Sequence, residues 1–261
     1  MDLGLKDKVV IVTGGAKGIG EGIVRSFAAE GAVVVIVNRS GGEGESLRDE
    51  LNSSGARAHF IIADLLDPAQ CKSAVEQTVA EFGRIDVLVN NAGVNDGADL
   101  NAGVEAFEQS LRNNIVHYYA MVHFALDALK KSKGNIINIG SKVADTGQGG
   151  TSGYAASKGA CNALTREWAV DLAPFGIRSN AVIPAEVMTP LYERWVKTLP
   201  NPEETLKKIC DAIPFERRMT SKEEMADMVV FLASEKSSHT TGQIVYVDGG
   251  YTHLDRKCTL S

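Results

Sequence analysis

Short β-branched hydrophobic runs alternate with longer segments of helical periodicity along almost the whole chain. The runs are apolar on both faces, as strands of a parallel sheet must be when helices cover both sides. They predict strands at Lys8–Thr13, Val33–Asn38, Arg57–Ile62, Val87–Asn90, Asn135–Ile139, Arg178–Ile183 and Ile244–Val247. Helical patterns fill the gaps, at Ile19–Ala29, Glu43–Ser53, Ala69–Phe82, Phe107–Lys130, Gly153–Leu172 and Lys222–Ala233. This alternation predicts an α/β fold, a doubly wound parallel sheet of about seven strands with helices on both faces.

One stretch interrupts the alternation, between Pro184 and roughly Ser221. Four of the seven prolines lie inside it, yet two segments between them have helical patterns, Leu191–Leu199 and Glu203–Ile213. A long excursion at the carboxyl edge of a sheet is typical of a lid or a substrate loop. Because no linker, repeat or low-complexity tract divides the chain, we expect residues 1–261 to form one domain, with 184–221 as a substrate-loop insertion.

The composition is that of a folded protein outside the membrane. Hydrophobic residues make up 44% of the 261 positions and charged residues 23%, which excludes a disordered chain. The longest apolar runs have six residues, far short of the roughly 20 that span a bilayer. The formal charge of −6 and the lack of a basic stretch argue against a nucleic-acid partner.

The cysteine and histidine positions indicate neither disulfides nor a metal. The four cysteines form no Cys-x-x-Cys and, like the five histidines, show no metal-ligand spacing. We therefore expect reduced thiols, no bound metal and a cytoplasmic protein, since the N-terminal residues also lack the features of a signal peptide.

A glycine-rich turn joins the first predicted strand to the first predicted helix, with the sequence Thr13-Gly14-Gly15-Ala16-Lys17-Gly18-Ile19-Gly20. Glycines let the backbone turn sharply and approach a pyrophosphate, which the unpaired N–H groups and the positive end of the helix dipole then attract. Strand and helix stand where such a site requires them. We therefore expect a dinucleotide here, held by Gly14, Lys17, Gly18, Ile19 and Gly20.

The end of the second predicted strand indicates which dinucleotide is bound. NAD sites usually carry an acid there, which bonds the ribose 2′-hydroxyl. This chain has Asn38 and Arg39 instead. Arg39 and Lys17 can bind a 2′-phosphate, although two acids at the start of the next helix dilute the positive field. The interpretation is NADP as the preferred cofactor, with NAD still open.

Polar turns also follow the third and fourth predicted strands. After the third, Asp64-Leu65 places a carboxylate where an adenine amino group can donate to it. After the fourth, Asn90-Asn91-Ala92-Gly93 brings an amide that can join strand ends through backbone bonds and a glycine that can lie close to the ribose. Further cofactor candidates are thus Asp64, Leu65, Asn91, Ala92 and Gly93.

Tyr154 and Lys158 lie four residues apart, which places them on one face of a helix. An ammonium beside a phenol favours tyrosinate, so Tyr154 can be the general acid or base for a carbonyl/hydroxyl pair. Ser141 ends the fifth predicted strand and can bond the substrate oxygen. Asn114 lies in the preceding long helix, where its amide can hold a water linked to Lys158 and relay the proton.

These motifs make the chain similar to the short-chain dehydrogenase/reductases over about residues 5–250. The order and spacing that carry the resemblance are those of the glycine-rich turn, Asn90–Gly93, Asn114, Ser141, Tyr154-Ala155-Ala156-Ser157-Lys158 and Asp248-Gly249-Gly250. The resemblance implies a single Rossmann-type domain and a catalytic tetrad of Asn114, Ser141, Tyr154 and Lys158, with Lys158 also on the nicotinamide ribose. It adds Pro184, Val187 and Thr189 to the cofactor site, with Thr189 on the carboxamide. Ala185 departs from the glycine that the family usually has there.

The resemblance also implies partners. The family commonly forms tetramers through its two long helices, so we expect a homotetramer. The residues after Asp248 could then reach a neighbouring subunit and bring His253 or Arg256 near its site. An exposed tail is the alternative.

A finer likeness is to bacterial sugar dehydrogenases of the L-fucose dehydrogenase type. The segments that carry it are Ile183–Glu193, Ser238–Gly242, Ser141-Lys142, Gly147–Gly149, Asn95-Asp96 and Tyr251–Arg256. The likeness implies oxidation of the C1 hydroxyl of an L-fucose-like aldopyranose to a lactone. Tyr154, as tyrosinate, would remove the hydroxyl proton while hydride passes from C1 to the nicotinamide. Buried sugar hydroxyls need polar partners, and the candidates are Asn95, Ser141, Lys142, Gln148, Glu186 and, as a stacking surface, Trp195.

Other roles remain open for these side chains and for the enzyme. Lys142 and Glu186 can be rim charges, and Trp195 can pack the insertion against the body. The same tetrad serves NADPH-dependent reductases of ketones, steroids or 3-oxoacyl groups, so the fold does not decide the substrate. A nucleotide-sensing binding protein without turnover is a more distant alternative.

Overall fold

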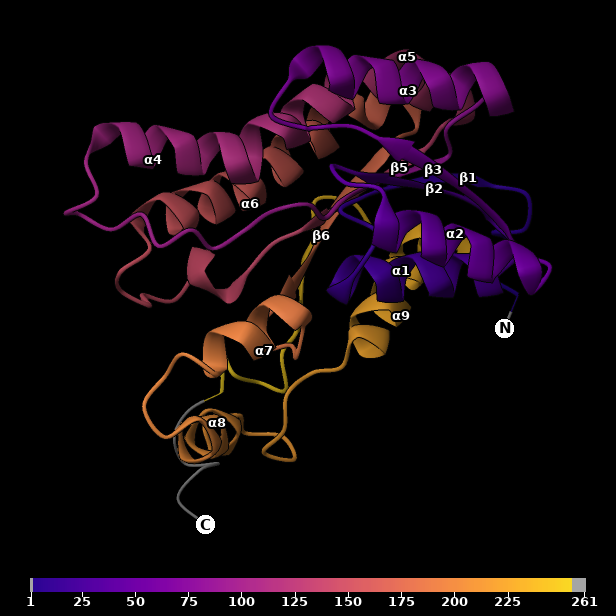
Figure 1. The fold of residues 1–261 in the computed structure, drawn as a ribbon. Helices are drawn as coiled ribbons and strands as arrows, with labels where there is room; N and C mark the ends of the chain where they lie inside the picture. The colour runs from indigo at the N-terminus through magenta and orange to yellow at the C-terminus, as the bar shows by residue number, and fades with distance from the viewer. Residues whose placement is uncertain (1, 255–261) are drawn as a thin grey trace.

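The strands form one parallel sheet in the computed structural model, which describes residues 2–254 (Figure 1). The strand order across the sheet is β3-β2-β1-β4-β5-β6-β7. The strands are β1 (Val9–Thr13), β2 (Val33–Asn38), β3 (Arg57–Ile62), β4 (Val87–Asn90), β5 (Asn135–Ile139), β6 (Arg178–Pro184) and β7 (Ile244–Val247). The predicted doubly wound sheet is confirmed, because apolar runs of this length on both faces are stable only between two helical layers. Arg256 and Cys258 lie outside the described residues.

The helices follow the predicted alternation, with one exception. Those of the body are α1 (Gly18–Ala29), α2 (Gly42–Ser53), α3 (Pro68–Phe82), α4 (Val104–Leu111), α5 (His117–Ser132), α6 (Ser152–Leu172) and α9 (Lys222–Ala233). No helix of the described residues is long and apolar enough to cross a membrane.

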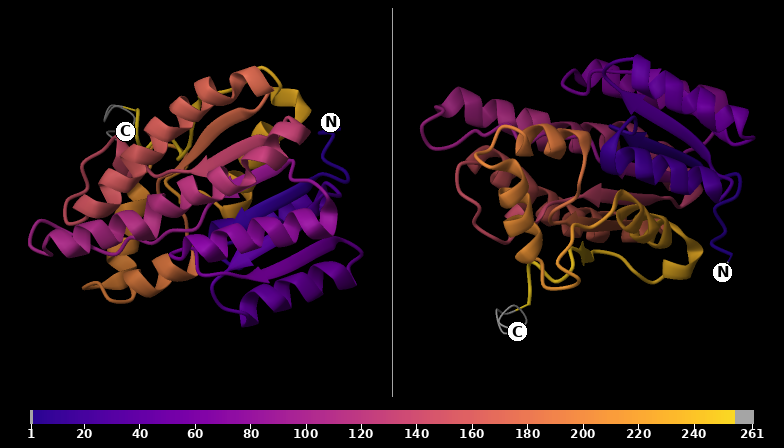
Figure 2. Two further views of the ribbon diagram at one scale, coloured as in Figure 1. Left: turned by 90° about the horizontal axis from the view of Figure 1, so that it is seen from above. Right: turned by 60° about the horizontal axis from the view of Figure 1, so that its bottom comes forward.

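The sheet lies between two layers of helices (Figures 1 and 2), and a hydrophobic core lies on each of its two faces. On one face, alternate residues of β1 such as Val10 pack with α1, α2 and α9, where Phe27 and Met225 are fully buried. On the other face, Ile11 packs with α3, α5 and α6, where Met121 is fully buried. The period of two along each strand therefore sends neighbouring residues into different cores.

The exception is the predicted helix Phe107–Lys130, which is not continuous. A π-helical segment, Arg112–Val116, separates α4 from α5. A π-turn bonds residue i to i+5 and holds one residue more than an α-turn, so its hydrogen-bond register is absent from the hydrophobic pattern. The turn contains the fully buried Asn114, and such turns often occur at functional sites.

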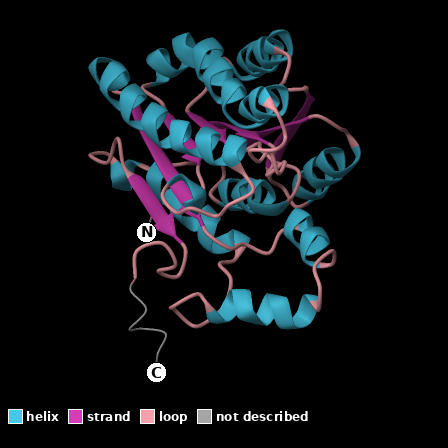
Figure 3. Ribbon diagram, turned by 90° about the vertical axis from the view of Figure 1, so that its left-hand side faces the viewer, coloured by secondary structure: helices cyan, strands magenta, loops and turns pink. Residues whose placement is uncertain are grey.

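The predicted insertion contains two short helices, α7 (Pro190–Val196) and α8 (Pro202–Asp211). Each begins with a proline, whose fixed φ and missing N–H suit the first helical position. The described part of α8 has no buried residue. Figures 1 and 3 show it at one end of the molecule, apart from the two helical layers that cover the sheet.

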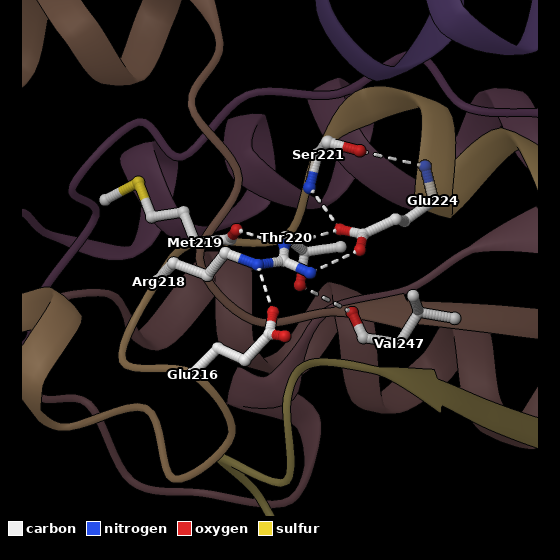
Figure 4. A network of polar contacts seen from close by, with 7 residues as sticks. All are labelled: Glu216, Arg218, Met219, Thr220, Ser221, Glu224 and Val247. Carbon is white, nitrogen blue, oxygen red and sulfur yellow. Dashed lines mark hydrogen bonds and ion pairs between the residues drawn. The ribbon is translucent and has the colours of Figure 1, made fainter.

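An arginine clamp marks the return of the chain to the body (Figure 4). Arg218 donates to both carboxylate oxygens of Glu224, at 2.9 and 2.7 Å, and its Nε donates to Glu216 at 2.6 Å. Ser221 and Glu224 form a capping box at the start of α9. The next contact upstream, from Thr220 Oγ1 to the carbonyl of Val247 at 3.2 Å, ties this junction to β7.

Candidate active site

The glycine-rich turn lies where the strand order reverses, between the carboxyl ends of β1 and β4, as ligand sites of such sheets do. Gly14 and Gly18 have φ of 63° and 60°, a region that favours glycine. A Cβ at Gly20 would collide with the carbonyl oxygen of Gly14. No side chain caps α1, so its first N–H groups are left for a ligand. This bare backbone against a helix N-terminus fits a pyrophosphate.

The two cations expected at the ribose differ in their surroundings. Lys17 Nζ pairs at 2.9 Å with Oε2 of Glu43, one of the two acids expected to dilute the positive field. The pair is exposed on both sides, at 48% and 62%, and exposed pairs are weak enough for an anion to displace. Arg39 is exposed beyond the end of β2, and no ion pair of Arg39 occurs within residues 2–254. Arg39 is therefore the better candidate for a 2′-phosphate.

Asn91 joins the ends of β1 and β4. Its Nδ2 donates to the carbonyl oxygens of Thr13 and Gly14 at 2.9 and 3.1 Å, and its N–H donates to Thr13 Oγ1 at 2.9 Å. Two residues on, Gly93 faces Asn114 and Lys158. A Cβ at Gly93 would lie 2.8 Å from Asn114 Oδ1 and 3.8 Å from Lys158 Nζ. The missing side chain leaves room there for a flat group such as a ribose or nicotinamide ring.

Thr189 closes the other side of the glycine-rich turn. A Cβ at Gly18 would meet Thr189 Cγ2 at 3.2 Å. The Thr189 hydroxyl caps α7 by accepting from the N–H of Tyr192 at 3.2 Å. Val187 is buried and forms a parallel bridge with Thr220. The chain after β6 is thus fixed over the glycine-rich turn before the insertion begins.

The remaining cofactor candidates keep local contacts. Asp64 Oδ1 accepts from the N–H of Leu66 at 3.1 Å, and the N–H of Asp64 donates to Gln70 at 2.8 Å. Asp64 and Leu65 are half-buried at the end of β3, and Asn38 is half-buried at the end of β2. These side chains remain possible contacts for the adenosine part of a dinucleotide.

Lys158 lies buried on α6, at 3% exposure. Its Nζ donates to the carbonyl oxygen of Ile139 at 2.8 Å and to the hydroxyl of Tyr118 at 3.3 Å. It lies 5.6 Å from the ring centre of Tyr154, one turn earlier on the helix. The structure therefore brings the ammonium beside the phenol, on the helix face where the spacing predicts it.

Ser141 follows β5 and is nearly buried, at 8% exposure. Its oxygen accepts from the N–H of Val143 at 3.4 Å, which caps a short 3-10 turn. The hydroxyl proton is not used by this bond, so it remains available for a substrate oxygen. Tyr154 is half-buried. Both side chains are thus on packed elements with their reactive atoms unengaged by other side chains.

Asn114 makes two hydrogen bonds that the prediction did not include. Its Oδ1 accepts from the N–H of Val94 at 2.7 Å, and its Nδ2 donates to the carbonyl oxygen of Ser110 at 3.0 Å. Each end of the amide makes one hydrogen bond, which leaves one N–H and one oxygen lone pair for the expected water. The amide also braces the loop after β4 against the π-turn. The proton-relay role of Asn114 stays a prediction.

Lys142 and Glu186, expected to bind substrate separately, form an ion pair with each other. Their side chains are 9% and 12% exposed. The Lys142 ammonium also lies 3.9 Å from the ring centre of Tyr251. Tyr192 hydrogen-bonds to Glu186, and burial, this bond and the carboxylate charge hold the pKa of Tyr192 above its usual range. The two residues are therefore half of a four-residue cluster, and the alternative of rim charges is wrong.

The other substrate candidates are on exposed segments. Asn95 and Gln148 are exposed in the loops after β4 and β5. Trp195 is 47% exposed and meets Tyr192 edge-on, with ring centres 5.0 Å apart. The exposed part of the Trp195 ring is free to contact a ligand, and packing of its buried part against the body stays an alternative.

The sequence analysis missed Tyr118, Tyr192 and Tyr251. Tyr118 is 40 residues from the lysine that it bonds, and Tyr192 belongs to a helix whose contacts depend on how the insertion folds back. Each contact joins segments that no local pattern relates. Within residues 2–254, no group of three or more His, Cys, Asp or Glu side chains could hold a metal ion.

Comparison with known proteins gives a consistent group of relatives. Residues 14–252 match the family model described as Enoyl-(Acyl carrier protein) reductase. The chain is 38% identical to an L-fucose dehydrogenase from Bos taurus, over 93% of this chain and 88% of the relative. It is 35% identical to a 3-oxoacyl-[acyl-carrier-protein] reductase from Thermotoga maritima, over 94% and 98% of the two chains.

Solved structures agree in fold over nearly the whole chain. The crystal structure of the Cj0485 dehydrogenase is 47% identical, with a TM-score of 0.93 and 98% of each chain covered. The aldohexose dehydrogenase of Thermoplasma acidophilum is 32% identical, with a TM-score of 0.88 and 98% of each chain covered. Dehydrogenases and reductases thus share this architecture from end to end.

Proposed function

The chain belongs to the short-chain dehydrogenase/reductase family and is an oxidoreductase, and we propose that it oxidises the C1 hydroxyl of an aldopyranose similar to L-fucose to the lactone. The observation that carries the proposal is the 38% sequence identity to an L-fucose dehydrogenase over 93% of the chain. The similarity to an aldohexose dehydrogenase supports the same class of substrate. This family typically uses NAD or NADP.

The residues of the site support oxidation of a hydroxyl. Tyr154, as tyrosinate, removes the proton of the C1 hydroxyl, and Ser141 donates a hydrogen bond to the same oxygen. The Lys158 ammonium beside Tyr154 stabilises the ionised phenol. Asn114 holds the loop that ends at Gly93, so the floor of the site stays in place. When bound, a nicotinamide dinucleotide supplies the hydride acceptor.

The substrate side of the site is polar, which suits a sugar. The Lys142–Glu186 pair, Tyr192 and the open ring of Trp195 offer donors, acceptors and a stacking surface near the end of β6. Each buried sugar hydroxyl left without a partner costs about 1–3 kcal/mol. The role of residues 184–221 as a substrate-binding insertion is part of this proposal.

NADP is our proposed preferred cofactor, with Arg39 as the main contact of its 2′-phosphate. No acid stands at the end of β2, and Arg39 is unpaired within the described residues. Replacing Arg39 should raise the KM for NADP about tenfold or more and leave the KM for NAD nearly unchanged. A homotetramer also remains a proposal. An exposed apolar side chain on α6, Val170 at 74%, would suit a partner surface.

Absorbance at 340 nm with NADP or NAD and a panel of aldoses tests the proposal. The panel includes L-fucose, D-arabinose and L-galactose at alkaline pH. We expect turnover of sugars that share one ring configuration. Absence of turnover with every aldose would contradict the sugar assignment.

The second candidate is NADPH-dependent reduction of a ketone, steroid or 3-oxoacyl group. The 3-oxoacyl reductase relative and the family model's description favour it. Oxidation of NADPH by diketones or 3-oxo compounds, without activity on aldoses, would favour this second candidate. The roles proposed for Tyr154, Ser141 and Lys158 would then be the same, with a different substrate.

A further inference from the structure

A second phenol lies against the ammonium of Lys158, from the opposite helix. Tyr118 is fully buried in the first turn of α5, directly after the π-turn. Its hydroxyl donates to the carbonyl oxygen of Ile139 at 3.1 Å and accepts from Lys158 Nζ at 3.3 Å. Lys158 Nζ donates to the same carbonyl at 2.8 Å. Three polar atoms from β5, α5 and α6 therefore form a closed triangle.

The hydrogen bonds of this triangle take the place of the water molecules that solvate an exposed ammonium. A charge in such a place is costly unless hydrogen bonds compensate it, and the alternative is loss of the proton. The Ile139 carbonyl and the Tyr118 hydroxyl fill two of the three donor positions of the ammonium. The third remains for the substrate side of the site, toward Tyr154 and Gly93.

We propose that Tyr118 is a positioning residue that keeps Lys158 charged and in place, and thereby extends the alkaline pH range in which the enzyme works. Oxidation needs two opposite ionisation states at once, an ionised Tyr154 and a protonated Lys158. The higher the pH at which Lys158 loses its proton, the wider is the range in which both exist. The inference rests on the roles proposed for Tyr154 and Lys158, and not on the identity of the substrate.

The groups that face Lys158 are consistent with this role. Burial raises the pKa of Tyr118 to about 12, so its hydroxyl stays neutral and accepts a hydrogen bond. Burial raises the pKa of Cys161 on α6 to about 11. His117 on α5 is neutral in the working range, because burial lowers its pKa to about 4. Burial by itself would lower the pKa of Lys158, but Tyr118 and Tyr154 oppose it and the net shift is upward.

The test is the pH dependence of NADPH and NADH binding, followed by fluorescence without any substrate. The ammonium of Lys158 is expected to bond the nicotinamide ribose, so affinity should fall as that group loses its proton. In the unaltered protein we expect little change up to the ordinary lysine value of 10.5. In Tyr118→Phe, the loss of one hydrogen bond to a charged group should move the fall downward by about one to two pH units.

Three variants separate this role from a structural one. Tyr119→Phe alters the neighbouring tyrosine, which is 57% exposed, and should shift nothing. Lys158→Arg carries a group that stays protonated throughout, so adding Tyr118→Phe to it should leave the pH dependence unchanged. If Tyr118→Phe does not fold, Tyr118→Met removes the same hydroxyl with a flexible side chain and carries the same expectation.

Two results would overturn the inference. One is a pH dependence of binding in the folded Tyr118 variants that matches the unaltered protein. The other is that Tyr118→Phe shifts the pH dependence of binding by the same amount in a protein that also carries Lys158→Arg. Neither result depends on an aldose, so a failed sugar assay and a failed inference remain distinguishable. With any active substrate, the alkaline fall of kcat/KM in Tyr118→Phe should move by the same amount as the binding curve.

Discussion

The proposed catalytic wall and the insertion differ in how firmly they are held. The wall, formed by β5, the π-turn, α5 and α6, fixes Asn114, Tyr118 and Lys158 at exposures of 0–3% and gives each two hydrogen bonds. The insertion carries α8, which has no buried residue, and Trp195, which is 47% exposed. The groups proposed for the chemistry are therefore on the more firmly packed surface, whereas those proposed to meet the rest of a substrate are on the more exposed one.

The insertion is anchored at its two ends. Before α7, Glu186 pairs with Lys142 after β5, and Tyr192 in α7 hydrogen-bonds to the same Glu186. After α8, Arg218 ties the returning chain to Glu224 at the start of α9. Each anchor can be altered alone, so the contrast between wall and insertion can be tested piece by piece.

The largest effect is expected in the wall. Tyr154→Phe removes the proton acceptor and should lower kcat/KM by about 10²- to 10⁴-fold, with little change in stability, because the side chain is only half-buried. Absorbance at 340 nm measures the rate and urea unfolding the stability. Tyr119→Phe is the control. More than a few per cent of residual activity would remove Tyr154 from the mechanism.

The next effect is expected at the first anchor. Glu186→Gln leaves the Lys142 ammonium buried without its carboxylate, which should cost about 3 kcal/mol in the free energy of unfolding. We also expect a raised KM for the substrate with kcat nearly kept, since the wall is untouched. Lys142→Met combined with Glu186→Gln should recover most of the stability, which a double-mutant cycle in urea measures. A fall in kcat with an unchanged KM would contradict this expectation, because it would indicate that the pair affects the chemical step rather than substrate binding.

A smaller, pH-dependent effect is expected at the second anchor. The Arg218 bond, and a bond from Ser221, lower the pKa of Glu224 to about 2. A lowered pKa means that the stabilisation is complete above the ordinary value of 4.5 and is lost as the pH falls toward 2. Arg218→Gln should therefore cost no more than about 1 kcal/mol at neutral pH and reduce the acid sensitivity. Urea unfolding at pH 6 and 3.5 measures both; identical acid sensitivity in variant and parent would count against the anchor.

The smallest effect is expected on α8 itself. Lys208 pairs with Glu204 at 2.7 Å, with side-chain exposures of 72% and 59%. Lys208→Ala should change the free energy of unfolding by less than about 0.5 kcal/mol and leave kcat and KM unchanged. Thermal unfolding and the standard rate assay are sufficient measurements. A marked rise in KM would show that α8 contributes to the site as directly as Trp195 is proposed to do.

The sequence predicted the fold well where one local pattern governs the outcome. The bounds of β2 and β5 match the structure, because runs such as Val33–Asn38 can be stable only inside a parallel sheet. The spacing of Tyr154 and Lys158 also sufficed, since one helix carries both. The interruption at Arg112–Val116 was missed, because hydrophobic periodicity follows which face is buried and not which carbonyl each N–H bonds.

Contacts between distant segments account for the rest. Lys17 pairs directly with Glu43, an acid 26 residues away that was expected only to dilute the field, and Lys142 meets an acid 44 residues away. Each residue type was compatible with a ligand role, and only the packing of helices and loops decided which charges pair. For the same reason the sequence did not predict the contact of Tyr118, on α5, with Lys158 on α6.

The π-turn at Arg112–Val116 changes the rotation of α5 about its axis relative to α4. One extra residue in a helical turn rotates everything that follows by about 100° relative to everything before it. Tyr118 and the rest of α5 therefore take their angular setting from a backbone irregularity rather than from their own sequence. A protein engineer who deleted one residue there would turn the whole of α5 and swing Tyr118 away from Lys158, with every side chain chemically unchanged.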